Sequence, residues 1–296
     1  MSVICSVLAT ATPLVDTHLR SAIEAALPVK TPATVLWEGH AAEWALPDTV
    51  DTAGLCAALR SQFAALPVDI NVFAPAGLRR KKLLLCDMDA TIVAGETLDE
   101  LAVFAGLGEK VAAITARAMN GDISFHDALR ERVGLLSGLA ADSIEKVLAG
   151  MHYIPGARSL IATMKAHGVK TALVSGGFRN FTSVVREQLG FDHDFGNVLH
   201  VADGKLTGTV EEPIQDRFTK QKVLHELCGI YDFSQLDAAA VGDGANDLLM
   251  LETAGLGVAF QPKPALARQV SLHIIHSDLR ALLFLQGYYY SDIKHI

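Results

Sequence analysis

The stretch LLLCDMDAT, residues 83–91, decides the fold because two acidic residues follow directly after a short apolar run. No polar residue interrupts Leu83–Cys86, which is typical of a parallel strand that is buried on both faces. Comparable runs occur at 171–174, 238–241 and 256–260, and helical patterns lie between them. This alternation predicts an α/β fold with a Rossmann-like, doubly wound parallel sheet.

The regions around this core predict further units. Residues 1–76 show the order strand, helix, strand, strand, helix, strand, which predicts a small ferredoxin-like α+β domain. Residues 77–296 are expected to form the second domain. Within it, residues 97–152 contain no convincing strand and follow the first core strand, so they predict an inserted helical cap. Residues 197–210 predict a hairpin.

Composition narrows the class of protein. Half of the 296 residues are apolar and a fifth are charged, which fits a globular protein with a sizeable core. The net charge of -8 gives no reason to expect binding to nucleic acid or to an anionic membrane. The basic run 79–82 is therefore expected to be a solvated lead-in to the first core strand. The four cysteines form no CxxC pair, so we expect reduced thiols in a cytoplasmic protein.

Acidic residues follow the predicted core strands. Asp87 and Asp89 come after the first strand, whereas Asp243, Asn246 and Asp247 lie in a glycine-rich loop after a later one. The carboxyl ends of parallel strands meet at one sheet edge, so these groups are expected to converge. Neighbouring carboxylates repel each other unless a cation lies between them, and Mg²⁺ prefers such oxygen ligands. The alternative for each segment is an ordinary acidic turn.

Groups that could bind phosphate also lie near strand ends. Ser175, Gly176 and Gly177 offer a hydroxyl and backbone N–H groups at the predicted start of a helix. The alternative is an ordinary helix N-cap. Lys220, near the start of a later helix, could neutralise a phosphoryl oxygen, but Lys222 is an equal candidate by spacing alone.

In this order, these segments resemble the four motifs of the haloacid dehalogenase (HAD) superfamily, over about residues 82–260. The resemblance is closer to the phosphoserine phosphatases of that superfamily. It extends to ETLDE at 96–100, AMNG at 118–121, LRERV at 129–133, VSGGF at 174–178, DGKLTG at 203–208 and VGDGAND at 241–247. Ala90 is a departure, because that family often has Ser there. We expect little effect, since the side chain at this position is not a motif carboxylate.

The resemblance implies a hydrolase that converts O-phosphoserine to serine and phosphate, the last step of L-serine biosynthesis, with Mg²⁺ as cofactor. It implies that Asp87 is the nucleophile, which forms a phospho-aspartate, and that Asp89 is the general acid and base. The metal would be held by Asp87, by the backbone carbonyl of Asp89 and by Asp243. The residues implied around the phosphoryl group are Ser175, Gly176, Lys220 and Asn246.

The resemblance also implies substrate contacts in the cap. Glu96 would bind the ammonium group of phosphoserine and Arg132 its carboxylate. Met119 and Phe125 would close over the ligand. The implied supporting residues are Thr91, Gly177 and Asp247, of which Asp247 would orient metal-bound water or hold Lys220.

Other functions and partners remain open at this stage. The same site could act on another small phosphomonoester, or pass phosphate to another alcohol. A non-catalytic amino-acid sensor is an alternative of a different class, although a sensor has no need of Asp87, Asp89, Lys220 and Asp243 together. The N-terminal region is similar to the ACT-like regulatory domains of some family members, so a small-molecule effector is a candidate partner there. A homodimer is also considered.

Overall fold

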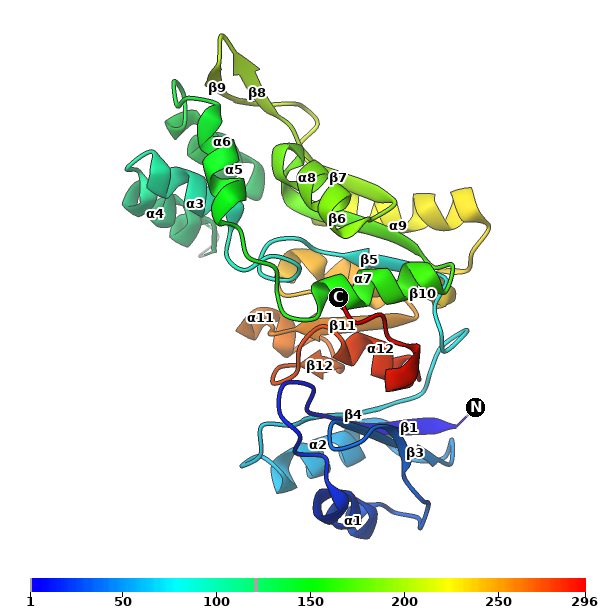
Figure 1. The fold of residues 1–296 in the computed structure, drawn as a ribbon. Coiled ribbons are helices and arrows are strands. Elements are labelled where there is room, and N and C mark those ends of the chain that lie inside the picture. The colour runs from blue at the N-terminus through cyan, green and yellow to red at the C-terminus, as the bar shows by residue number, and fades with distance from the viewer. Residues whose placement is uncertain (1, 120–121) are drawn as a thin grey trace.

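The computed structural model describes residues 2–119 and 122–296. These residues form an N-terminal unit and a larger second unit that lie one above the other, each with its own sheet (Figure 1). None of the helices in the described residues has the length and apolarity needed to cross a membrane.

The N-terminal unit is an antiparallel sheet covered by helices on one face. Its strands are β1 (Val3–Leu8), β2 (Thr34–Trp37), β3 (Ala41–Leu46) and β4 (Asp69–Phe73), and its helices are α1 (Thr17–Ala26) and α2 (Thr52–Gln62). The strands lie in the order β2-β3-β1-β4. The order of elements along the chain is the one that the sequence predicts.

Both faces of this antiparallel sheet are covered, so every residue of β1 is buried. Cys5 and Val7 pack with the side chains of α1 and α2. Ile4 and Leu8 point the other way and share a core with the second unit. Side chains alternate along a strand, so the two faces of β1 serve two different cores.

The second unit has a parallel sheet in the order β12-β11-β10-β5-β6-β7. The strands are β5 (Leu83–Cys86), β6 (Lys170–Phe178), β7 (His193–Asn197), β10 (Ala238–Gly242), β11 (Leu256–Phe260) and β12 (His273–Ile274). Short 3-10 turns lie at η1 (Gln235–Asp237), η2 (Ala245–Asp247) and η3 (Tyr290–Asp292).

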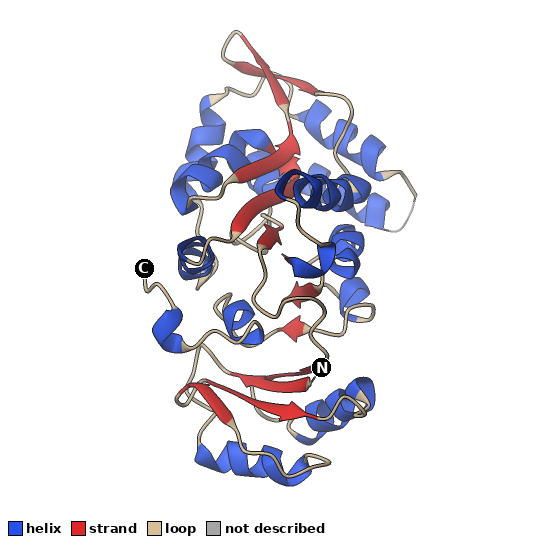
Figure 2. Ribbon diagram, turned by 90° about the vertical axis from the view of Figure 1, so that its right-hand side faces the viewer, coloured by secondary structure: helices blue, strands red, loops and turns tan. Residues whose placement is uncertain are grey.

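Helices cover both faces of the parallel sheet (Figure 2). One face packs against α7 (Ala157–Ala166), α8 (Arg179–Leu189) and α12 (Ala281–Leu285), and the other against α9 (Arg217–Tyr231), α10 (Leu248–Thr253) and α11 (Pro264–Ala267). Leu84 and Cys86 of β5 face the first set, whereas Leu83 and Leu85 face the second. The apolar run of β5 therefore belongs to a parallel strand buried on both sides, as the sequence predicts.

The cap is inserted between β5 and α7. It consists of α3 (Thr97–Phe104), α4 (Gly108–Met119), α5 (Phe125–Leu135) and α6 (Asp142–Gly150). The two chain segments that connect it to the core run side by side, and the N–H of Ala94 donates to His152 O (2.8 Å). The hairpin of β8 (Leu199–Ala202) and β9 (Lys205–Val210) also reaches the cap, where the N–H of Ala141 donates to Gly204 O (2.8 Å). The cap is thus attached from two sides (Figure 1).

Some local predictions were wrong. β6 continues through Ser175 to Phe178, so the Ser175 segment lies at the end of a strand and not at the start of a helix. The basic run 79–82 is a solvated lead-in only in part, because Arg80 and Lys82 are exposed but Lys81 is not. Lys81 is 3% exposed and donates to Leu236 O (2.7 Å), because this segment passes between packed elements. The edge strands β7 and β12 were not predicted.

Buried polar contacts at β4 join the two units. The carboxylate of Asp69 accepts the N–H groups of Ile275 (2.7 Å) and Ser277 (2.8 Å). The side-chain amide of Asn71 donates to His273 O (2.9 Å) and accepts the His273 N–H (2.9 Å). Hydrogen bonds that involve a carboxylate are stronger than neutral ones. These contacts therefore fix how the N-terminal unit sits on the segment around β12.

Replacing Asp69 by Ala would leave the buried N–H of Ser277 and the partly buried N–H of Ile275 without an acceptor. Each such donor costs about 1–3 kcal/mol, so we expect the free energy of unfolding to fall by about 2–4 kcal/mol in urea denaturation. Asp69→Asn keeps an acceptor oxygen and should lose less. Equal stability of Asp69→Ala and the wild type would contradict the assigned role of this carboxylate.

Candidate active site

The carboxyl ends of β5 and β10 bring buried carboxylates together. Asp87 follows β5, and Asp243 and Asp247 follow β10; one oxygen of each lies within 4.8 Å of the others. The N–H of Asp87 donates to Val241 O (3.0 Å), which holds the two strand ends side by side. A side chain at Gly242 would not fit, because a Cβ there would lie 2.3 Å from Cγ of Asp247. Loops that are far apart in the sequence therefore meet at one sheet edge.

Burial and the neighbouring negative charges make Asp87 and Asp243 difficult to ionise. Burial raises the pKa of Asp87 well above its usual value and Asp247 raises it further, whereas Lys220 acts in the opposite direction. Burial also raises the pKa of Asp243, which Lys263 opposes. A divalent cation would relieve this repulsion, and carboxylate oxygens are the ligands that Mg²⁺ prefers. The cluster of acidic oxygens therefore fits Mg²⁺.

Lys220 is a buried cation beside this cluster. It lies in the first turn of α9, is 2% exposed, and places its Nζ 2.8 Å from Asp87 Oδ1 and 2.5 Å from Asp247 Oδ1. Burial lowers the pKa of Lys220, but the two carboxylates outweigh this effect and leave the pKa raised, so the amine stays charged. Lys222 is exposed and lies 3.5 Å from Glu226. Of the two lysines, Lys220 is the one at the site.

Asp89 lies next to the cluster and is held by hydrogen bonds. The N–H of Thr97 donates to its Oδ1 (2.9 Å), and Ser175 Oγ donates to its Oδ2 (3.2 Å). Ser175 Oγ in turn accepts the N–H of Gly177 (2.8 Å). Burial, followed by the charge of Glu96, raises the pKa of Asp89 to about 6 against the lowering effect of the hydrogen bonds. This carboxyl group can therefore carry a proton near neutral pH.

The turn after Asp89 has an unusual backbone. Ala90 has a φ of +55°, a left-handed conformation that costs a residue other than glycine about 1–2 kcal/mol. Its N–H donates to Gly95 O (2.9 Å), and the N–H of the buried Thr91 donates to Met88 O (3.2 Å). This turn directs the chain from the edge of the sheet toward the cap.

A cavity of about 490 Å³ lies between core and cap, with Lys220 in its lining. Gly176 and Asn246 of the core and Phe125 of the cap also line it. A Cβ at Gly176 would lie 3.7 Å from the ring of Phe125, so this ring stands directly over the end of β6. The side chain of Met119, the other predicted cap contact, lies outside the described residues.

The two charged residues predicted to recognise the substrate lie at the entrance of the cap and in α5. Glu96 precedes α3, and its Oε1 is 2.9 Å from Nζ of Lys263, which is also 3.0 Å from Asp243 Oδ2. Burial lowers the pKa of Arg132, whereas Asp99 and Glu96 raise it. Neither Lys263 nor Asp99 is among the site residues predicted from the sequence. Lys263 follows β11, so the rule that polar groups past strand ends converge would have found it.

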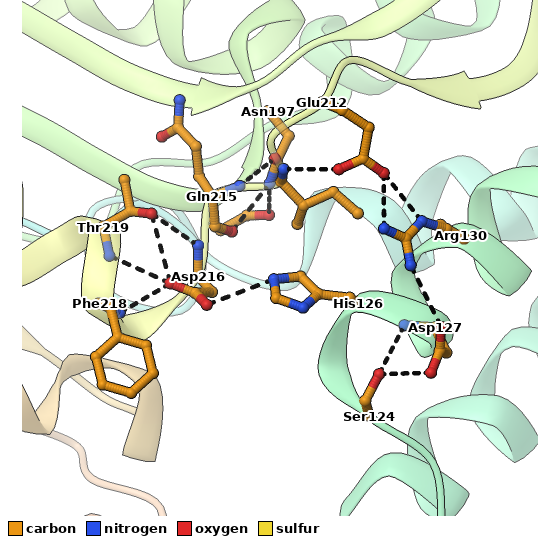
Figure 3. Close-up of polar contacts among 12 residues, drawn as sticks. Ser124, His126, Asp127, Arg130, Asn197, Glu212, Gln215, Asp216, Phe218 and Thr219 are labelled. Atoms are coloured by element: carbon orange, nitrogen blue, oxygen red, sulfur yellow. Dashed lines mark hydrogen bonds and ion pairs between the residues drawn. The ribbon is translucent and has the colours of Figure 1, made fainter.

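Ion pairs connect α5 of the cap with the segment before α9 (Figure 3). Arg130 Nη2 lies 2.7 Å from Glu212 Oε1, and His126 Nε2 lies 3.4 Å from Asp216 Oδ2. Asp216 also caps α9 by accepting the N–H of Phe218 (2.9 Å). Asp216 and Phe218 both line the cavity. Cap and core therefore touch at the cavity rim. Nothing in the sequence singled out these pairs.

The family model of haloacid dehalogenase-like hydrolases matches residues 84–252 of this chain. The chain belongs to this family. The match begins in β5 and ends in α10, so it includes the carboxylate cluster and Lys220. It also includes the whole cap of this HAD hydrolase.

Relatives and solved structures agree with this assignment. A phosphoserine phosphatase of Streptomyces coelicolor is 42% identical over 240 residues, which make up 80% of this chain but only 58% of that protein. A structure described as a phospho-aspartyl intermediate analogue of phosphoserine phosphatase is 41% identical, has a TM-score of 0.65, and covers 69% of this chain and 98% of its own.

The N-terminal unit also has a counterpart in a solved structure. The crystal structure of a HAD family hydrolase from Salmonella enterica serovar Typhi is 29% identical with a TM-score of 0.86. It covers 96% of this chain and 98% of its own, so the likeness extends beyond the HAD core.

Replacing Lys220 by Met in Mg²⁺-free buffer would leave Asp87 and Asp247 buried without their cation. Removing one partner of a buried ion pair costs about 3–5 kcal/mol, and we expect a loss of that size in the free energy of unfolding from urea denaturation. Lys222→Met on the same helix is the matched control, and should change stability by less than about 1 kcal/mol because that pair is exposed. Similar losses in both variants would contradict the placement of Lys220.

Proposed function

We propose that this HAD hydrolase is a Mg²⁺-dependent phosphatase that converts O-phosphoserine to serine and phosphate through a phospho-aspartate on Asp87. The observation that carries the proposal is the position of Asp87, which shares a buried cluster with Asp243 and Asp247 and an ion pair with Lys220. A carboxylate can attack phosphorus when fixed positive charge reduces the repulsion between the two anions. The relatives named phosphoserine phosphatase support the choice of substrate.

The groups that would hold Mg²⁺ are the carboxylates of Asp87 and Asp243 and the backbone carbonyl of Asp89. When bound, Mg²⁺ would neutralise charge on the phosphoryl group and on the carboxylates. Asp247 lies in the same cluster, but its contact with Lys220 favours a supporting role, in which it keeps this lysine beside Asp87.

The reaction would proceed in two steps. A carboxylate oxygen of Asp87 attacks phosphorus, and the bond between phosphorus and the serine oxygen breaks. Asp89 in its protonated form gives its proton to that oxygen, for which the pKa of about 6 is suited. Asp89 then accepts a proton from the water that attacks the phospho-aspartate. Phosphate leaves, and both carboxyl groups return to their starting states.

Groups of the core would hold the phosphoryl oxygens. The cavity lining contains Gly176, Lys220 and Asn246, and Ser175 lies beside them through its hydrogen bond to Asp89. Lys220 would supply fixed charge, and the other groups would supply hydrogen-bond donors. Thr91 and Gly177 would support the two loops that carry these residues.

Groups of the cap would select the substrate. Glu96 would bind the ammonium group and Arg132 the carboxylate of phosphoserine, because a guanidinium can bind a carboxylate through two parallel hydrogen bonds. Phe125, and with it Met119, would cover the ligand and exclude water. The charge of Glu96 acts to raise the pKa of Arg132, which supports their placement around one small ligand.

The proposal extends to the N-terminal unit. We place the domain boundary between residues 76 and 77, and we propose that residues 1–76 form an ACT-like regulatory domain that binds a small-molecule effector. The strand order β2-β3-β1-β4 with both helices on one face supports this assignment. A homodimer is part of the same proposal, and sedimentation of the full chain would test it.

Asp87→Asn should abolish the release of phosphate from phosphoserine. Loss of a covalent nucleophile lowers kcat by about 10³-fold or more, and colorimetric phosphate release in the presence of Mg²⁺ measures this. EDTA should remove the wild-type activity as well. Asp203→Asn, in the exposed turn of the hairpin, is the control and should keep full activity. Equal turnover of phosphoserine, phosphothreonine and sugar phosphates would contradict the specificity, and transfer of phosphate to an added alcohol would favour a phosphotransferase.

Asp89→Asn should slow catalysis without preventing binding. The amide cannot shuttle a proton, so we expect kcat to fall by about 10²–10⁴-fold. Its oxygen can still accept the Thr97 N–H, so Mg²⁺ affinity measured by calorimetry should stay within about threefold of the wild type. If Asp89→Asn bound Mg²⁺ much more weakly but kept the wild-type kcat at saturating Mg²⁺, the role assigned to Asp89 would be contradicted.

A further inference from the structure

Lys263 lies at the meeting point of the core and the cap. It follows β11 and stands at the N-cap position of α11, and its backbone N–H donates to Asp243 O (2.9 Å). The side chain is 48% exposed, yet its Nζ lies 3.0 Å from Asp243 Oδ2 and 2.9 Å from Glu96 Oε1. One amine thus bridges a carboxylate of the acidic cluster and the charged residue directly before the cap.

The positive charges of the site are divided between two lysines, each of which lies near two carboxylates. Lys220 is already within ion-pair distance of Asp87 and Asp247. Among the described residues, Asp243 and Glu96 have their ion pairs with Lys263 instead. Lys220 therefore serves the carboxylates beside the proposed nucleophile, and Lys263 serves the two that lie toward the cap.

Glu96 also depends on Lys263 for its orientation. Although Glu96 stands at the N-cap of α3, its carboxylate makes no capping hydrogen bond. Among the described residues, the hydrogen bond of the Glu96 carboxylate is the one that it accepts from Nζ of Lys263. A long side chain without a fixed partner samples many rotamers, and fixing them at the moment of binding weakens affinity. A charge-assisted hydrogen bond to Lys263 fixes the orientation beforehand.

We propose that Lys263 is a positioning residue, which holds Glu96 ready for the ammonium group of the substrate and balances the charge of Asp243 beside the metal. This inference rests on the proposed phosphoserine phosphatase function. It assigns to Lys263 an effect on substrate selection, because only a substrate with an ammonium group uses Glu96.

The first test compares substrates with and without an ammonium group. Lys263→Met keeps most of the length of the side chain but removes its charge. At saturating Mg²⁺ we expect the KM for phosphoserine to rise about tenfold, from the loss of a charge-assisted hydrogen bond, with kcat within about threefold. The KM for p-nitrophenyl phosphate should not change. Lys222→Met is the matched control and should match the wild type with both substrates.

A second pair of variants separates positioning from general damage to the structure. Lys263→Arg keeps the charge and should restore the KM for phosphoserine to within about threefold of the wild type. In a Glu96→Gln background, Lys263→Met should raise this KM by less than about twofold, because the two residues act as one unit. Equal increases in KM for both substrates, or a full tenfold effect in the Glu96→Gln background, would overturn the proposal.

Calorimetry with Mg²⁺ alone tests the contact with Asp243 without any substrate. Removing a cation that lies 3.0 Å from this carboxylate reduces repulsion of the metal, so Lys263→Met should bind Mg²⁺ at least about threefold more tightly. Weaker or unchanged binding would overturn this part of the inference. If the wild type does not hydrolyse phosphoserine at all, the proposed function fails, whereas the Mg²⁺ titration still decides the assignment of Lys263 to Asp243.

Discussion

The site depends on placing several carboxylates close together and out of water. Asp87, Asp243 and Asp247 lie within 4.8 Å of one another, and charges of one sign repel strongly in a medium of low dielectric constant. Such a cluster persists only with positive charge beside it. Lys220 supplies part of that positive charge from the first turn of α9. The negative charge that Lys220 does not neutralise explains why these oxygens fit a divalent cation.

The fold meets this requirement through its rigid parts. β5 and β10 are neighbours in the parallel sheet, and helices cover both faces, so the ends of these strands have little freedom to separate. Gly242 lets Asp247 approach the backbone, which a side chain would prevent. The groups proposed for the chemistry therefore belong to the core, where packing holds them in place.

The cap has a different character. It connects to the core through a pair of adjoining segments and through the β8–β9 hairpin, and its ion pairs at the cavity rim are exposed. Exposed ion pairs contribute little stability, so these contacts add little to the attachment of the cap. The groups proposed for the chemistry thus lie in the core, whereas Phe125 and Arg132 lie in the cap. Glu96 and Lys263 stand at the boundary between the two.

The sequence by itself determined the class of the fold and most of the strand ends, because apolar runs and helical periodicity report locally on burial. It also singled out Asp87, Asp89 and Asp243, since a residue that follows a core strand must lie at the edge of the sheet. It could not separate Lys220 from Lys222. Two positions that are two residues apart point about 160° away from each other around a helix, so only one of them can face the site.

Only the tertiary structure decided which lysine that is, because the packing of α9 on the sheet sets the rotation of the helix. The same holds for Lys81, whose basic neighbours predicted exposure although it lies buried between packed elements. It holds again for Lys263, which contacts a residue 167 positions earlier in the chain. A local apolar pattern records which face of an element is buried, whereas the burial and the partner of a charged residue depend on which distant segments pack against it.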